Sequence, residues 1–216
     1  YYKRKFEQES DHLSRLRHKN IVMVVDAFRA NSTSYYVMQY IDGQSLDSLI
    51  AAKGRLSTDE TVGITRQVGS ALSCMHSMGM LHLDVKPANV MMADEKTAIL
   101  IDFGLSKQYD QNGQPESSTT VGSGTPGYAP IEQANHREGK DFPVQMDVYA
   151  LGATMLKMLT GQRPPEASDI LNFGFPKKEL LAVGVTSSVA MVVEKAMAPQ
   201  QNKRYKTVND FLKALD

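Results

Sequence analysis

The sequence has little cysteine, no tryptophan and no excess of charge of either sign. Cys74 is the only cysteine among 216 residues, so no disulfide can form within the chain. A reducing compartment such as the cytoplasm is therefore expected. Lys and Arg total 24, and Asp and Glu also total 24. Proteins that bind nucleic acids or anionic membranes carry a basic excess, so we expect neither partner.

Long hydrophobic runs and a leader sequence are also missing. No apolar run approaches the roughly 20 residues that a membrane-spanning helix requires. The opening residues, YYKRKFEQES, contain neither an initiator Met nor the apolar segment of a signal peptide. We therefore interpret the chain as a piece of a longer protein.

Apolar periodicity predicts some β structure first and mostly helices afterwards. Residues 6–16 have a helical pattern, and the runs NIVMVVDAF and SYYVMQYI predict a pair of strands. Residues 45–54 and 57–79 predict helices, the second of which begins with a capping box of Ser57 and Glu60. VMM and TAILI predict short strands, and VQMDVYALGATMLKMLTG predicts a buried helix. Two or three further helices are expected after it.

The stretch HLDVKPANV, residues 82–90, contains residue types that phosphoryl transfer requires. The reaction needs a carboxylate near the acceptor hydroxyl, a cation on the phosphate and oxygen ligands for Mg²⁺. Asp84, Lys86 and Asn89 supply these types, and Asp102 in IDFG adds a second carboxylate after an apolar run. Each pattern alone is usually a solvated pair or a turn, so the inference depends on their combination.

Motifs over nearly the whole chain, in order, resemble the C-terminal part of a eukaryotic-type Ser/Thr protein kinase domain. The resemblance implies an α+β, protein-kinase-like fold with a mostly helical large lobe. Residues 1–40 would be a remnant of the small lobe, with helix C and two strands, and residues 41–216 the large lobe. GTPGYAPIEQ is more similar to bacterial members of the family than to animal ones. The motifs are FEQESDHLSRLRHKNIV, YYVMQYIDG, HLDVKPANV, DFG, GSGTPGYAPIEQ, DVYALG and PQQNKRY.

The resemblance implies ATP and Mg²⁺ as cofactors and assigns catalytic roles. Asp84 would accept or orient the proton of the acceptor hydroxyl, and Lys86 would neutralise the γ-phosphate. Asn89 and Asp102 would hold Mg²⁺. Thr125 would bond Asp84 and Lys86, as in Ser/Thr kinases; its alternative role is that of a turn residue. The implied partner is a protein substrate with a Ser or Thr acceptor.

The resemblance also assigns nucleotide-binding and structural positions. Met38 would be the gatekeeper, and Met91 would lie under the adenine ring, a role that is compatible with core packing. His82 would be a buried structural histidine, Asp147 would anchor the catalytic loop, and Glu132 would pair with Arg204. The implied nucleotide-binding residues are Glu9, Met38, Gln39, Tyr40, Ile41 and Met91. The implied apolar spine is Leu13, Val24, His82 and Phe103.

One departure from the family concerns activation. Leu83 stands where many kinases have an Arg that meets a phosphate on the activation loop, and its side chain has no donor. We therefore expect activation to depend little on such a phosphate, although five hydroxyl residues lie nearby. These are Ser117, Ser118, Thr119, Thr120 and Ser123.

A second departure is that no Gly-rich loop and no lysine on a neighbouring strand precede Glu9. We therefore interpret the chain as a truncated kinase domain that lacks three strands, with little or no activity of its own, since positioning and charge dominate kinase catalysis. Its two remaining strands would leave an open edge. We expect dimerisation through that edge, or disorder, at residues 1–40.

Two alternative functions remain open. A pseudokinase scaffold would keep the fold without catalysis, but it would not need Asp84, Lys86, Asn89 and Asp102 together. A small-molecule phosphotransferase shares the catalytic loop and the metal-binding Asp. The motifs GTPGYAPIEQ and DVYALG, together with Arg204, favour the protein kinase over this alternative.

Overall fold

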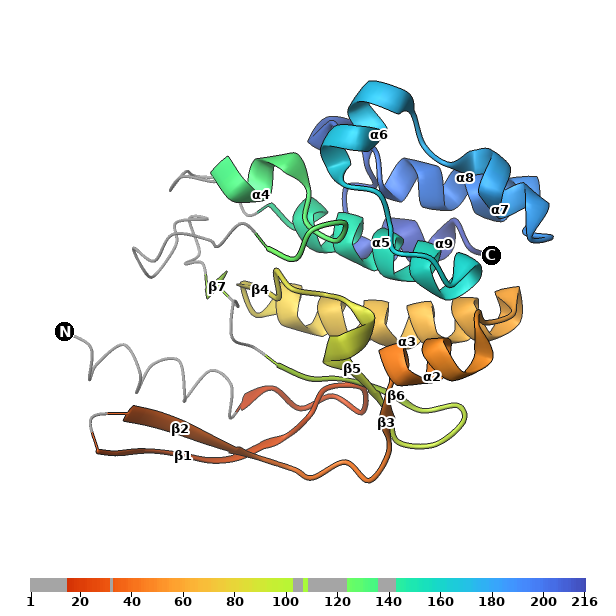
Figure 1. Cartoon of the computed structure of the whole chain (residues 1–216). Coiled ribbons are helices and arrows are strands. Elements are labelled where there is room, and N and C mark those ends of the chain that lie inside the picture. The colour runs from red at the N-terminus through yellow and green to blue at the C-terminus, as the bar shows by residue number, and fades with distance from the viewer. Residues whose placement is uncertain (1–14, 32, 103–106, 109–123, 136–142) are drawn as a thin grey trace.

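The computed structural model describes residues 15–31, 33–102, 107–108, 124–135 and 143–216. A projecting strand pair lies on one side of the molecule, and helices make up most of the remainder (Figure 1). The strands are β1 (Val24–Ala30), β2 (Thr33–Met38), β3 (Gln44–Ser45), β4 (Met80–Leu81), β5 (Val90–Met92), β6 (Ala98–Leu100) and β7 (Lys107–Gln108). The α-helices are α2 (Leu46–Lys53), α3 (Thr58–Ser77), α4 (Ile131–Asn135), α5 (Gln145–Thr160), α6 (Ala167–Phe173), α7 (Lys177–Ala182), α8 (Ser187–Ala196) and α9 (Val208–Lys213). Two 3₁₀ turns are η1 (Pro87–Asn89) and η2 (Gln201–Lys203).

The predicted strand pair is confirmed as the antiparallel hairpin β1–β2. Phe28 lies opposite Tyr35, and their rings stack with centroids 5.2 Å apart. Cross-strand aromatic pairs of this kind stabilise a hairpin and fix its register. A bulge between Val24 and Asp26 shifts the register near the start of β1.

The run NIVMVVDAF, expected to form one strand, is divided between two sheets. Its first residues, just before β1, pair with β6 and not with β2. Val22 N donates to Leu100 O over 3.0 Å, and Leu100 N donates to Asn20 O over 2.8 Å. The buried Asn20 side chain donates to Ala98 O over 2.7 Å, which holds this segment against β6. The chain therefore connects the hairpin to the three-stranded sheet β3–β5–β6 before it enters β1.

Helix α3 begins with the predicted capping box. Ser57 Oγ accepts from Glu60 N over 3.2 Å, and the Glu60 carboxylate accepts from Ser57 N over 2.9 Å. Lys53 Nζ also donates to Glu60 over 2.6 Å. The hydrogen bonds from Lys53 and then from Ser57 lower the pKa of Glu60 to about 2.

Replacing Ser57 with Ala is expected to lower the free energy of unfolding by about 1 kcal/mol, because loss of the capping hydroxyl leaves the Glu60 N–H without its acceptor. Urea unfolding at neutral pH measures this loss. Ser57→Asn keeps a side-chain acceptor and should retain most of the stability. Glu60 has a lowered folded pKa, so its contribution is present above its ordinary value of 4.5 and is lost as the pH falls towards 2. The deficit of Ser57→Ala should therefore shrink over that range, and a deficit independent of pH would contradict the reciprocal cap.

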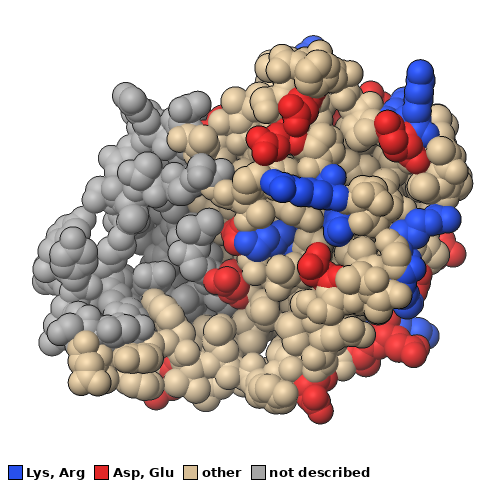
Figure 2. All heavy atoms as spheres, viewed as in Figure 1, with Lys and Arg blue, Asp and Glu red and all other residues tan. Residues whose placement is uncertain are grey.

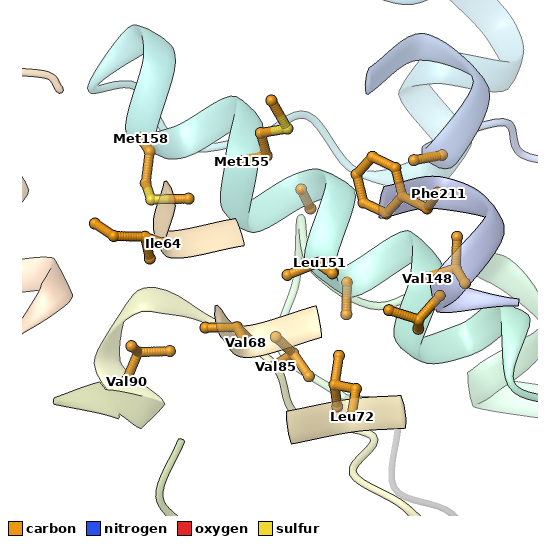
Figure 3. Packing of buried hydrophobic residues seen from close by; sticks show 14 of the residues in the cluster. Ile64, Val68, Leu72, Val85, Val90, Val148, Leu151, Met155, Met158 and Phe211 are labelled. Atoms are coloured by element: carbon orange, nitrogen blue, oxygen red, sulfur yellow. The ribbon is translucent and has the colours of Figure 1, made fainter. Parts of the chain in front are cut away.

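The core is built around α5, which is buried along most of its length as the sequence predicts. Helices α3, α8 and α9 pack against it. Figure 3 shows apolar side chains from α3, α5, α9, β5 and the segment between β4 and β5 meeting in this core. Among them are Val68, Leu72, Val85, Leu151 and Phe211, all nearly inaccessible to solvent.

After α5 the structure has four α-helices, α6 to α9, where the sequence predicted two or three. The short helices α6 and α7 span 7 and 6 residues. Such short segments carry little periodic signal, so their helical state depends on packing against the rest of the domain.

Two further properties are the absence of a membrane-spanning helix among the described residues and a mixed distribution of surface charge. Among the residues that the structure describes, no helix combines the length and hydrophobicity needed to cross a bilayer. On the face seen in Figure 2, Lys and Arg side chains lie interspersed with Asp and Glu side chains. This distribution agrees with the equal numbers of acidic and basic residues in the sequence.

Candidate active site

The motif HLDVKPANV, residues 82–90, is called the catalytic loop below and connects β4 to β5 through η1. Leu83 has a φ of 67° and is only 2% exposed, which is an unusual combination for a non-glycine residue. Pro87 then begins η1, and Asn89 N donates to Lys86 O over 2.9 Å to close the turn. The loop therefore reverses the chain sharply, and its Asp84 and Lys86 side chains contact Thr125.

Asp84, Lys86 and Thr125 form a closed triangle of hydrogen bonds. Lys86 Nζ donates to Asp84 Oδ2 over 2.7 Å and to Thr125 Oγ1 over 2.8 Å. Thr125 Oγ1 donates to Asp84 Oδ1 over 2.6 Å. The hydrogen bonds expected for Thr125 are thus confirmed, and its carbonyl also accepts from Tyr128 N in a turn. Thr125 is therefore both a turn residue and a member of this network.

Asn89 extends the network on its other side. Its Nδ2 donates to Asp84 O over 2.8 Å and to Asp84 Oδ2 over 3.0 Å. Both amide protons are thereby directed at Asp84, so the side-chain oxygen of Asn89 is directed away from that residue. Asp84 and Lys86 are 13% and 24% exposed at their side chains, so solvent and a ligand can still reach them.

The backbone brings Asn89 next to Asp102, the second expected magnesium ligand. Ile101 N donates to Asn89 O over 2.9 Å, which ties the residue before Asp102 to Asn89. The Asp102 backbone has a φ of 64°, a left-handed conformation that Asp tolerates better than most residues. Within the described part of the chain no cluster of three His, Cys, Asp or Glu side chains could hold a metal by itself. Magnesium typically takes one or two protein oxygens together with phosphates and water, which matches this pair.

The positions assigned to the nucleotide lie on β2, the connection after it, and β5. Met38 ends β2, and Gln39 N donates to Met23 O over 2.9 Å. Tyr40 is 84% exposed, whereas Ile41 packs against the core. Met91 on β5 is paired with Ser45 on β3, just beyond this connection. Glu9 lies outside the described residues, as do Leu13 and Phe103.

Asp147 holds the backbone of the catalytic loop from α5. Its Oδ2 accepts from His82 N over 2.9 Å, and its Oδ1 accepts from Leu83 N over 2.8 Å. His76 Nε2 also contacts Oδ2 at 2.8 Å. Burial alone would raise the pKa of Asp147, but the contacts with His76 and His82 outweigh it, so the pKa is lowered. The anchoring contacts expected for Asp147 are thus confirmed.

His82 is fully buried. Burial lowers its pKa, and its ring makes two compatible contacts. Nε2 lies 3.3 Å from Ile101 O, and Nδ1 accepts from Asp84 N over 3.3 Å. The expected buried, hydrogen-bonded histidine is confirmed.

Comparison with known proteins decides the family. The family model described as "Protein kinase domain" matches residues 2–215. The chain belongs to the protein kinase domain family. A probable serine/threonine-protein kinase PknB of Lactococcus lactis is 31% identical over 215 residues, covering 96% of this chain and 34% of that protein. The serine/threonine-protein kinase PknB of Mycobacterium tuberculosis is 28% identical over 218 residues, again 96% and 34%. This protein kinase domain thus spans about a third of the length of these relatives.

A solved structure supports the same fold. Rad53 residues 1–466, crystallised in complex with AMP-PNP, superposes with a TM-score of 0.79 at 23% identity. The match covers 96% of this chain and 53% of that chain. The α+β kinase fold expected from the sequence is therefore confirmed, and so is the similarity to bacterial kinases.

In this kinase domain Leu83 belongs to a small apolar cluster. It packs with Leu81 and Met146, and the partly buried Val144 joins them. A side chain in this environment has no means of binding a phosphate. We therefore still expect activation to depend little on activation-loop phosphorylation. The five hydroxyl residues named above lie outside the described residues.

The expected pair between Glu132 and Arg204 is present and two-pronged. Arg204 Nη2 donates to Glu132 Oε2 over 3.1 Å, and Nη1 donates to Oε1. The Arg204 side chain is fully buried and also donates to Ala198 O, Pro199 O and Gln145 O. These bonds use the donors of the guanidinium, so the charge is satisfied inside the fold.

Two polar contacts near this site join residues that lie far apart in the sequence. His76, which has no part in the motifs described above, contacts Asp147. The buried amide of Gln133 donates to Leu83 O over 2.8 Å. The partners lie 71 and 50 residues apart in the sequence, so no local pattern could have indicated either contact.

Proposed function

We propose that the protein containing this domain transfers the γ-phosphoryl group of Mg·ATP to Ser or Thr hydroxyls of proteins. The hydrogen-bonded triangle of Asp84, Lys86 and Thr125 carries the proposal. It brings a carboxylate and an ammonium group into contact at a partly exposed position. Positioning and charge stabilisation of this kind account for most of kinase catalysis.

Each residue has a specific part in the proposed reaction. Asp84 would orient the acceptor hydroxyl and accept its proton. Lys86 has three N–H groups, and its two described hydrogen bonds leave one to donate to a phosphate oxygen. Asn89 and Asp102 would hold Mg²⁺, which neutralises phosphate charge when bound. Thr125 would keep Asp84 and Lys86 in register.

The proposal is tested with γ-labelled ATP, Mg²⁺ and a generic protein acceptor, followed by phosphoamino-acid analysis. The protein is used at full length. Label is expected on Ser and Thr and should disappear when EDTA removes the metal. Label confined to Tyr, or transfer only to small molecules, would overturn the assignment. An absence of transfer despite nucleotide binding would instead favour a scaffold.

We also propose a lobe boundary, a set of nucleotide-binding residues and a cellular compartment. The lobes would divide between residues 40 and 41, within the connection from β2 to β3. Met38, Gln39, Tyr40, Ile41 and Met91 would surround the nucleotide, and Glu9 would contribute from helix C. A reducing compartment, the cytoplasm, agrees with the single cysteine.

Self-association through the hairpin is a further part of the proposal. In the described residues β2 pairs with β1 alone, and Tyr35, Val37 and Met38 are each more than 40% exposed. Exposed strand edges with apolar side chains pair readily with other strands. A second copy could therefore add its hairpin to this edge.

Sedimentation velocity should accordingly show concentration-dependent dimers, and Val37→Lys should shift them to monomers because charge on an edge strand opposes pairing. Met191→Lys is the matched control, since Met191 is also exposed but lies on α8. Its dimer should persist. A chain of residues 1–216 that remains monomeric at all concentrations would contradict this part of the proposal.

A further inference from the structure

Gln133 contacts the two segments that carry Asp84 and Thr125. It belongs to α4, and only 1% of its surface is exposed. Its Nε2 donates to Leu83 O over 2.8 Å across 50 residues of sequence. Leu83 immediately precedes Asp84, so this bond fixes the carbonyl group next to the proposed catalytic carboxylate.

The same amide also packs against the segment that carries Thr125. A Cβ atom built on Gly124 would lie 2.6 Å from Gln133 Nε2, which means that the amide packs against the backbone of that glycine. Gly124 immediately precedes Thr125 and has a φ of 70°. Gln133 is therefore in contact with the residue before Asp84 and with the residue before Thr125.

Leu83 needs such support because of its backbone. Its φ of 67° is unfavourable for a branched, buried side chain and persists only where the surroundings impose it. Asp147 binds its N–H, and Gln133 binds its C=O. The peptide groups on both sides of the strained residue are thereby held by side chains from two different helices, α5 and α4.

We propose that Gln133 is a positioning residue that sets the register between Asp84 and Thr125. The inference rests on the proposed function, since it concerns the geometry of that same site. A glutamine suits the place because its amide can donate to a buried carbonyl without bringing in a charge. Small displacements of catalytic groups lower the rate strongly, whereas binding of the nucleotide on the other side of the loop need not change.

The test uses the full-length protein and compares Gln133→Met with Gln67→Met. Methionine has a similar length but no donor. Gln67 is the matched control because its amide also donates to a backbone carbonyl, Lys96 O over 2.6 Å, at the turn before β6. Gln133→Met should lower kcat by about 10- to 100-fold with little change in the KM for ATP. Gln67→Met should leave kcat unchanged even if it destabilises the fold.

Amide hydrogen exchange supplies a readout that needs no catalytic activity. In Gln133→Met, exchange should be faster in peptides covering residues 81–90 and 124–130, and unchanged around residues 94–98. Equal exchange in parent and variant, or an equal fall of kcat in Gln67→Met, would overturn the inference. If the parent transfers no phosphate, the proposed function fails, and the exchange measurement still decides whether Gln133 ties the two segments together.

Discussion

Asp84→Asn is expected to lower kcat by about 10²- to 10⁴-fold, the range that a general base contributes. Asn has nearly the same shape as Asp, but it cannot accept the proton of the hydroxyl group that is phosphorylated. It would also place an N–H group against either Lys86 Nζ or the Thr125 hydroxyl, both of which now donate to the carboxylate. The KM for ATP should change little, because the carboxylate is assigned to the acceptor hydroxyl.

Steady-state phosphorylation of a protein acceptor measures this effect. Asp94→Asn is the control, because Asp94 accepts hydrogen bonds from Lys96 N and Thr97 N within its own turn. It should keep the parental kcat. An Asp84→Asn variant that also kept the parental kcat would remove Asp84 from the reaction.

Asp147→Ala is expected to lower the free energy of unfolding by about 3–5 kcal/mol, as expected when one partner of a buried polar network is removed. The substitution leaves the N–H groups of His82 and Leu83 buried without an acceptor. It also releases one of the two contacts that hold Leu83 at positive φ. Asp147→Asn keeps one acceptor oxygen and should lose less.

Urea unfolding at several pH values measures the loss. Because the folded pKa of Asp147 is depressed, its contribution is present above the ordinary value of 3.8 and is lost as the pH falls below it. The difference between parent and Asp147→Ala should therefore be largest near neutral pH and shrink in acid. Asp169→Ala, at an exposed position on α6, should change stability by about 0.5 kcal/mol or less. A similarly small loss for Asp147→Ala would contradict the anchoring role.

Local signals predicted the elements whose stability is largely local. The capping box at Ser57, the apolar faces of α5 and the β-branched and aromatic runs of β1 and β2 each lie within one short window of sequence. The two-residue strands β3, β4 and β7 were not predicted. A pair of residues has no periodicity, and its extended state comes from a partner elsewhere in the chain.

The residues of the site likewise differ in whether a local stretch of sequence could predict them. Asp84, Lys86 and Asn89 lie within six residues, so their chemistry was evident together, whereas Thr125 was assigned only through family resemblance. The positive φ of Leu83 runs against the preference of its side chain, so no propensity could predict it. Gln133 and His76 act through contacts that exist only once α3, α4, α5 and the catalytic loop have packed.

The central claim is that Asp84 and Lys86 work as parts of one phosphoryl-transfer unit. The most direct measurement is kcat for Asp84→Asn, Lys86→Met and the double variant under saturating Mg·ATP. Residues that act as a unit give strongly non-additive losses. The double variant is expected to be about as slow as the slower single variant. Losses that multiply in the double variant, as for independent residues, would contradict it.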